Sequence, residues 1–141
     1  MTQPEKQKYV LHNQVGYLIR RANQRHLGIF ANQIGSLTPT QFSALIKLCE
    51  LGEASQNALG RETAMDAATI KGVVDRLQRK GLIDNKPDPN DARRLLLKPT
   101  AAAWKSQAEL IEKAQRISNE TLAPLSKSEQ DRFLFLLNKI I

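Results

Sequence analysis

The feature that most constrains this chain is the segment over residues 66–81, which reads DAATIKGVVDRLQRKG. Its apolar residues recur at helical spacing and form one stripe that must pack against the rest of the protein: Ile70, Val73, Val74 and Leu77. Asp66 is suited to accept hydrogen bonds from the first amides of this helix, and Gly81 to adopt the left-handed conformation that ends it. We therefore predict an amphipathic helix over residues 66–81.

The opposite face of this helix is small at its amino end and basic further along. At about 3.6 residues per turn, the outward positions are Ala68, Gly72, Asp75, Arg76 and Arg79, with Thr69 and Lys71 on the flanks. A helix that enters the major groove of DNA needs little bulk where its backbone approaches the bases, and cations for the phosphates. The alternative is an ordinary surface helix on which Asp75 and Arg79 form an ion pair.

A β-hairpin is expected directly after the helix. Residues 82–86 (LIDNK) and 95–98 (LLLK) are strand candidates, and in the polar segment between them Asp88 and Pro89 suit the first two positions of a type I turn. Arg93 and Arg94 lead from the turn into the second strand. The fold class that follows is mainly α with a small β-hairpin wing, a winged helix-turn-helix.

At these residues the chain resembles the MarR family of bacterial transcription regulators. The matching pieces are LTPTQF at 37–42, Thr69 through DRL at 75–77 to KGLI at 80–83, and DAR at 91–93 leading to Thr100. The resemblance rests on their joint order and spacing and covers nearly the whole chain. Ala92 stands where an arginine is common in the family, which leaves Arg93 as the main wing contact.

The chain is long enough for one domain, and we expect residues 1–141 to form a single MarR-like domain. Residues 37–100 are the predicted DNA-binding lobe, while residues 1–36 and 101–141 are predicted dimerisation helices. The first helix is expected from residue 7 to about residue 31, with a buried face of Leu11, Val15, Leu18, Ala22 and Ile29. The last helix crowds apolar residues near the chain end, which is a liability in a monomer, so a homodimer is expected.

The composition favours an anionic binding partner and argues against a membrane-spanning protein, a secreted protein and an enzyme. The net charge is +7 with a pI near 9.8, and residues 1–30 hold five lysines and arginines against one acidic residue. No apolar run approaches the roughly 20 residues that span a bilayer, and residues 1–5 lack a signal peptide's core, so we expect a cytoplasmic protein. His12 and His26 lack an acid or metal partner at ligand spacing, so no enzyme, metal or cofactor is expected.

The expected DNA contacts fall on three elements. Thr69 and Lys71 are expected near base edges, and Arg76 and Arg79 on phosphates. The wing contributes Arg93, in or beside the minor groove, together with Arg94; Asp91 is expected to position Arg93 rather than to touch DNA. A short helix after Ser55 supports the recognition helix, and Ser55 and Gln56 are its predicted phosphate contacts.

The first helix carries the expected effector residues, Tyr17, Arg20 and His26. The resemblance implies binding of small aromatic acids near this helix, and an arginine holds a carboxylate with two parallel hydrogen bonds. Arg20 and His26 point about 120° apart, so they reach one cavity only from different walls or different subunits. The alternative is that they are solvated basic residues. Phe30 and Trp104 are further candidates for pocket walls or plain core, and Cys49 is a core residue rather than an oxidation sensor.

Together these features predict a homodimeric, sequence-specific regulator that binds double-stranded DNA. We expect a repressor that leaves a pseudo-palindromic operator when a small aromatic acid binds. The alternative is a sequence-tolerant architectural DNA-binding protein without an effector, which would show a small ratio of specific to non-specific affinity.

Overall fold

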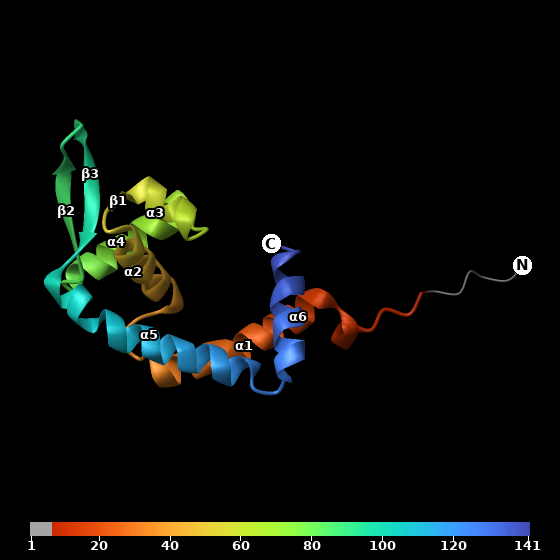
Figure 1. Cartoon of the computed structure of the whole chain (residues 1–141). Helices are drawn as coiled ribbons and strands as arrows, with labels where there is room; N and C mark the ends of the chain where they lie inside the picture. The colour runs from red at the N-terminus through yellow and green to blue at the C-terminus, as the bar shows by residue number, and fades with distance from the viewer. Residues whose placement is uncertain (1–6) are drawn as a thin grey trace, which may run out of the picture.

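The computed structural model describes residues 7–141 and shows two connected parts (Figure 1). The elements in chain order are a 3-10 turn η1 (Leu11–Asn13), α1 (Val15–Gln33), α2 (Pro39–Leu51), β1 (Ala54–Ser55), α3 (Gln56–Glu62), α4 (Ala67–Arg79), β2 (Ile83–Asp88), β3 (Asp91–Pro99), α5 (Ala101–Leu122) and α6 (Lys127–Asn138). Helices α2, α3 and α4 and the strands form one lobe, from which α5 leads back along α1 to α6. The predicted mainly-α fold with a β-hairpin wing is confirmed.

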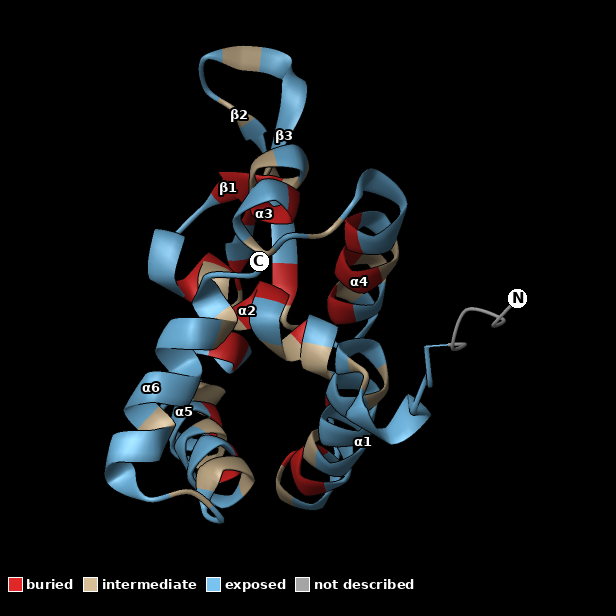
Figure 2. Cartoon of the chain, turned by 90° about the vertical axis from the view of Figure 1, so that its right-hand side faces the viewer, coloured by how far each residue is buried: buried red, intermediate tan, exposed pale blue. Residues whose placement is uncertain are grey.

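The core of the winged lobe lies where α2, α3 and α4 meet (Figure 2). The predicted stripe of α4 is buried, as all four of its apolar residues belong to this core. Leu45, Leu48 and Leu59 from the other two helices are each exposed by 1% or less. The apolar stripe therefore fixes which face of α4 remains free.

Local capping explains where α2 and α4 begin. Thr38 and Gln41 form a reciprocal capping box at the start of α2, with Pro39 in the first helical position. At α4, the carboxylate of Asp66 accepts a hydrogen bond of 2.7 Å from the amide of Thr69. Gly81 follows α4 with φ of +73°, as predicted from its position.

The turn between α3 and α4 is tight because Gly60 lacks a side chain. A Cβ at Gly60 would lie 3.1 Å from the carbonyl oxygen of Met65 and 3.2 Å from a methyl carbon of Ile70. Ala64, in the turn itself, has a positive φ of 55°. The two helices can therefore pack closely, which holds α4 in a defined direction.

The sheet is antiparallel, with the strand order β1-β3-β2. The hairpin is longer than the sequence predicts: β3 begins at Asp91, so Arg93 and Arg94 lie within the strand rather than before it. The short strand β1 is absent from the prediction because its pairing, Ala54 with Leu97 and Ser55 with Leu96, is non-local. An ion pair of 2.6 Å between Lys86 and Glu53 ties the wing to the loop after α2.

The expected first helix begins later than predicted. Residues 7–10 are not helical, and α1 begins at Val15 after the 3-10 turn. Of the predicted buried face only Ile29 is buried in the single chain, whereas Leu11, Val15, Leu18 and Ala22 are exposed. Residues 1–6 of the predicted dimerisation segment lie outside the described residues. No helix within residues 7–141 is long and apolar enough to cross a membrane.

Candidate functional site

The free face of α4 carries the residues predicted to meet DNA. Thr69, Lys71, Arg76 and Arg79 are all exposed. Lys71 forms an exposed ion pair with Asp75, with 3.0 Å between its ammonium nitrogen and a carboxylate oxygen. Asp75 therefore pairs with Lys71 and not with Arg79. Exposed pairs of this kind are weak, so Lys71 can leave Asp75 for another anion at little cost.

Two positively charged side chains, those of Lys71 and Arg76, lie near the middle turn of α4. A Cβ added at Gly72 would lie 3.7 Å from Nη1 of Arg76, so the guanidinium lies back along the helix, over Gly72. Lys71 extends in the opposite direction, toward Asp75 one turn later. Both positive groups therefore lie over the central turn of the exposed face.

The wing presents Arg93 to solvent and holds it near Asp91. The side chain of Arg93 is 91% exposed, and its Nε lies 3.3 Å from the Asp91 carboxylate, which also accepts a 3.0 Å hydrogen bond from the Arg93 amide. The predicted pairing of these two residues is confirmed. Arg94 is exposed as well, and by the alternation of a strand it faces the other side of the hairpin.

Ser55 and Gln56 differ in what they present to a partner. The Ser55 hydroxyl accepts a 3.2 Å hydrogen bond from the amide of Ala58, and the residue is only 8% exposed. It acts as the cap of α3. Gln56 is half-buried and its side chain is the more accessible of the two.

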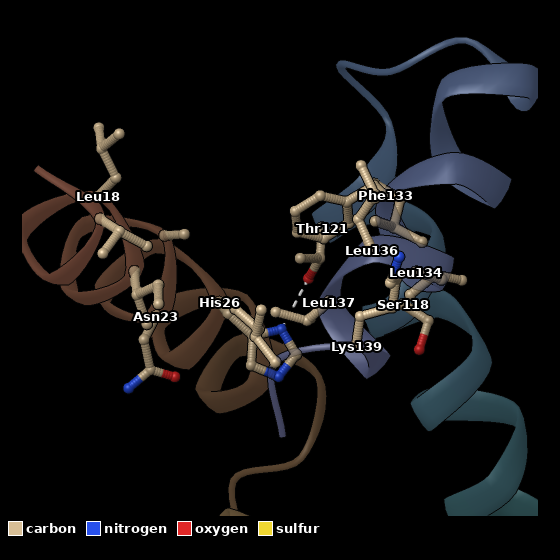
Figure 3. A pocket seen from close by; sticks show the side chains of 15 residues that line it. Leu18, Asn23, His26, Ser118, Thr121, Phe133, Leu134, Leu136, Leu137 and Lys139 are labelled. Atoms are coloured by element: carbon tan, nitrogen blue, oxygen red, sulfur yellow. Dashed lines mark hydrogen bonds between the residues drawn. The ribbon is translucent and has the colours of Figure 1, made fainter. Parts of the chain in front are cut away.

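A wide apolar groove is lined by α1, the end of α5 and α6 (Figure 3). Its volume is about 860 Å³, and side chains from all three helices line it. Val15, Leu18 and Ile19 form the α1 wall, while Phe133 and Leu137 come from α6. In the single chain α6 buries no residue, so its apolar face is uncovered.

His26 lies at the edge of this groove and bonds to the end of α5. Its Nδ1 is 2.8 Å from the hydroxyl oxygen of Thr121. The neighbouring Arg25 donates to the main-chain carbonyls of Thr121, at 2.7 Å, and Glu120, at 2.9 Å. Arg25 therefore caps the last turn of α5, a role that sequence reasoning missed because the partners lie 95 and 96 residues away.

Tyr17 and Arg20 form a separate cluster on α1. The Arg20 guanidinium lies 5.5 Å from the centroid of the Tyr17 ring, and Arg21 donates a 3.0 Å hydrogen bond to the Tyr17 hydroxyl. Neither Tyr17 nor Arg20 lines the groove that His26 borders. Within one chain, the three predicted effector residues therefore do not surround a single cavity.

A smaller cavity of about 320 Å³ lies between α2 and α5. Phe42, Ile46 and Ile111 give it apolar walls, and Gln115 and Asn119 give it polar groups. Phe30, one predicted wall, is instead a core residue that packs edge-on against Phe42, with 6.0 Å between the ring centroids. Trp104, the other, is 46% exposed and lines neither cavity.

Cys49 belongs to the core of the winged lobe. It is 6% exposed, and burial raises the pKa of its thiol above the ordinary value. The reactive thiolate is therefore disfavoured. This placement confirms the predicted core position.

The chain matches a protein-family model and is similar to several known transcription regulators. A sequence model of the MarR family matches residues 37–95. The HTH-type transcriptional repressor NicR of Pseudomonas putida is 38% identical over 94% of this chain and 85% of its own length. Among solved structures, a probable transcriptional regulator from Pseudomonas aeruginosa has 49% identity and a TM-score of 0.91, covering 94% of this chain and all of its own.

A third similar protein is BpsR of Bordetella bronchiseptica, whose structure is described as showing the mechanism by which 6-hydroxynicotinic acid regulates its DNA binding. It has 34% identity and a TM-score of 0.90, covering 95% of this chain and 97% of its own. The similarity extends over both the winged lobe and the terminal helices.

Proposed function

The chain belongs to the MarR family of transcription regulators, and on this premise we propose that it is a homodimeric repressor released from a pseudo-palindromic operator by a small aromatic acid. Membership of this family makes it a DNA-binding regulator and not an enzyme. The dimer, the repression and the effector are the proposed parts.

The observation that carries the proposal is the arrangement of basic residues on the winged lobe. Lys71, Arg76 and Arg79 are exposed on α4, and Arg93 and Arg94 are exposed on the wing that follows it. A helix in the major groove with a wing over the flanking backbone uses cations on both elements. We assign base contacts to Thr69 and Lys71, phosphate contacts to Arg79, Arg94, Ser55 and Gln56, and the minor groove to Arg93.

The dimer is supported by apolar residues that the single chain leaves uncovered. Val15 is 66% exposed on α1, and Phe135 and Ile140 are 61% and 64% exposed near the end of the chain. An uncovered apolar surface of this extent, around a groove of about 860 Å³, fits a helix from a second copy. Two copies would present two recognition helices about 34 Å apart, one turn of DNA.

The effector is supported by the likeness to BpsR and by cavity size. The pocket between α2 and α5 has a volume of about 320 Å³. Small-molecule sites have volumes of about 300 to 1,000 Å³, so this pocket is of a size that suits a single-ring acid. We propose that His26, Tyr17 and Arg20 contact the effector in the dimer, since none of them lines this pocket within one chain. Because these residues do not share a cavity in one chain, the carboxylate would be bound by Arg20 of the second copy.

Release requires that the effector bind one arrangement of the dimer better than the other. The cavity between α2 and α5 adjoins both the winged lobe and a dimerisation helix, so a ligand there contacts both parts at once. A ligand that fits only when the lobes are spaced wrongly for DNA shifts the dimer away from its operator.

The test is a titration of the operator complex with 6-hydroxynicotinic acid, using its amide as a control that keeps the ring and lacks the carboxylate. We expect the acid, and not the amide, to release DNA, and Arg20→Ala to keep operator affinity while losing this response. An unchanged response in Arg20→Ala would contradict the assignment of Arg20. Operator binding insensitive to every ring acid tested would instead favour an architectural protein.

A further inference from the structure

A glycine stands in the middle of the recognition helix, although the fold does not require one there. Gly72 is the sixth of thirteen residues in α4 and has no positive φ. Glycine destabilises a helix interior relative to alanine because it loses more backbone entropy on folding. Within residues 7–141, and apart from the helix backbone and the adjacent residues, only Nη1 of Arg76 lies within 4 Å of an added Cβ, at an ordinary contact distance of 3.7 Å. The reason for Gly72 must therefore lie on the exposed face.

The space that Gly72 leaves is taken by Arg76. Residues four apart lie one above the other on a helix, and the Arg76 side chain extends back by one turn toward the amino end of α4. The amino-terminal half of a recognition helix is the part that meets base edges. Arg76 thus starts from the carboxyl half of α4 and brings its guanidinium over the half that reads DNA.

Arg76 also differs from Lys71 in its ionic partners. Lys71 is held by Asp75, whereas no ion pair to Arg76 is found within residues 7–141. The guanidinium offers a rigid fork of donors that matches the O6 and N7 acceptors of guanine in the major groove. A Cβ at position 72 would only touch the guanidinium, whereas a side chain longer than that of alanine would occupy the space that the guanidinium takes.

We propose that Arg76 reads a guanine in each half-site, and that Gly72 makes this contact possible by leaving room for the guanidinium. This replaces the phosphate contact expected for Arg76 from the sequence. The inference rests on the proposed binding of a specific operator and adds the residue that determines part of its sequence.

The experiment compares the sequences bound from a random duplex pool by the full-length wild-type protein and by four variants: Arg76→Ala, Arg76→Lys, Gly72→Gln and Arg79→Ala. Affinity for the preferred sequence is then measured at several salt concentrations, and each melting temperature is recorded. Arg79→Ala is the matched control, because it removes one exposed arginine from the next turn of the same helix.

Loss of a bidentate base contact should weaken the base preference at one position of each half-site and leave the preferences at the other positions unchanged. For Arg76→Ala we expect discrimination at one G·C pair to fall by roughly 5- to 150-fold, with the salt dependence of binding retained. Arg76→Lys should retain only part of this discrimination, because lysine lacks the planar guanidinium that can donate two parallel hydrogen bonds to guanine. Gly72→Gln should fold like the wild type, because glutamine is a better helix former than glycine, yet discriminate less well at the same base pair because its side chain fills the space beside Arg76.

Two results would overturn the inference while leaving the proposed function standing. One is a uniform loss of affinity in Arg76→Ala across all sequences, with the salt slope reduced by about 2 for the two subunits, as for lost phosphate contacts. The other is Gly72→Gln with unchanged discrimination. If the wild-type protein enriches no sequence at all, the proposed operator binding fails and this inference fails with it.

Discussion

Replacing Arg93 with alanine should weaken operator binding strongly without affecting the fold. The side chain is 91% exposed and its partner in the structure is Asp91, at 3.3 Å, which is an exposed pair. Such a pair is worth at most about 1 kcal/mol, so moving Arg93 from Asp91 onto DNA costs little. An exposed wing residue with no packing role should shift unfolding by less than about 0.5 kcal/mol.

The size of the effect follows from two wings per dimer. Each lost arginine contact should lower affinity roughly tenfold, so the dimer should bind about 100-fold more weakly. If each Arg93 displaces one counterion from the backbone, the slope of log affinity against log salt should become shallower by about 1.8. The magnitude and the slope together identify an electrostatic contact.

Fluorescence anisotropy of a labelled operator at four or five salt concentrations gives both quantities. Lys98→Ala is the matched control, since Lys98 is an exposed cation at the other end of the same strand. Asp91→Asn, which keeps Arg93 but removes its ionic partner, should reduce affinity by only roughly threefold and leave the slope unreduced. Full affinity and an unchanged slope in Arg93→Ala would remove the wing from the DNA interface.

Three further predictions concern the dimer, the recognition helix and the thiol. A chain ending at Arg132 should sediment as monomer or aggregate, because it lacks the apolar residues of α6; a well-behaved dimer would refute that interface. Asp66→Ala should lower the stability measured by urea unfolding at neutral pH. The hydrogen bond from the Thr69 amide holds the pKa of the Asp66 carboxyl below its ordinary value. The stabilisation that this carboxylate gives to the fold is therefore complete above the ordinary pKa and is lost as the pH falls through the lowered pKa. An equal difference in unfolding free energy between wild type and Asp66→Ala at pH 7 and at pH 2 would contradict this. Because Cys49 is buried with a raised pKa, peroxide treatment should leave operator affinity intact, and Cys49→Ser should respond no differently; a peroxide-induced loss that Cys49→Ser abolishes would show a sensor.

The recognition helix could be predicted from sequence because its signals are local. Asp66, the apolar stripe and Gly81 lie within one segment, and the Asp66 carboxylate bonds to an amide only three positions away. The capping boxes of Thr38 and Ser126 are equally short-range and were equally predictable. Elements whose ends are decided by their own residues can be placed without knowledge of the tertiary structure.

Other features depend on distant partners and could not be predicted. Strand β1 exists only because residues 54 and 55 pair with β3, and Arg25 caps a helix end that is remote in sequence. The apolar spacing of α1 predicted a buried face, yet most of it is exposed in the single chain. Periodicity shows that a face is apolar but does not say whether the same chain or a second copy covers it.

The orientation of Arg76 over Gly72 could be predicted from the sequence only in part. Spacing alone puts both residues on the exposed face of α4, and that much was predicted. Which way the long arginine side chain extends depends on its rotamer, which sequence does not specify. The structure supplies this direction, and on it rests our proposal that Arg76 contacts a base rather than a phosphate.

The most direct test of the central claim is selection of bound sequences from a random duplex pool at low and at higher salt. The account predicts a pseudo-palindrome whose half-sites lie about 10 base pairs apart and which persists at the higher salt, as two symmetric recognition helices require. Binding that enriches no sequence and disappears as salt rises would contradict it and would identify a sequence-tolerant architectural protein.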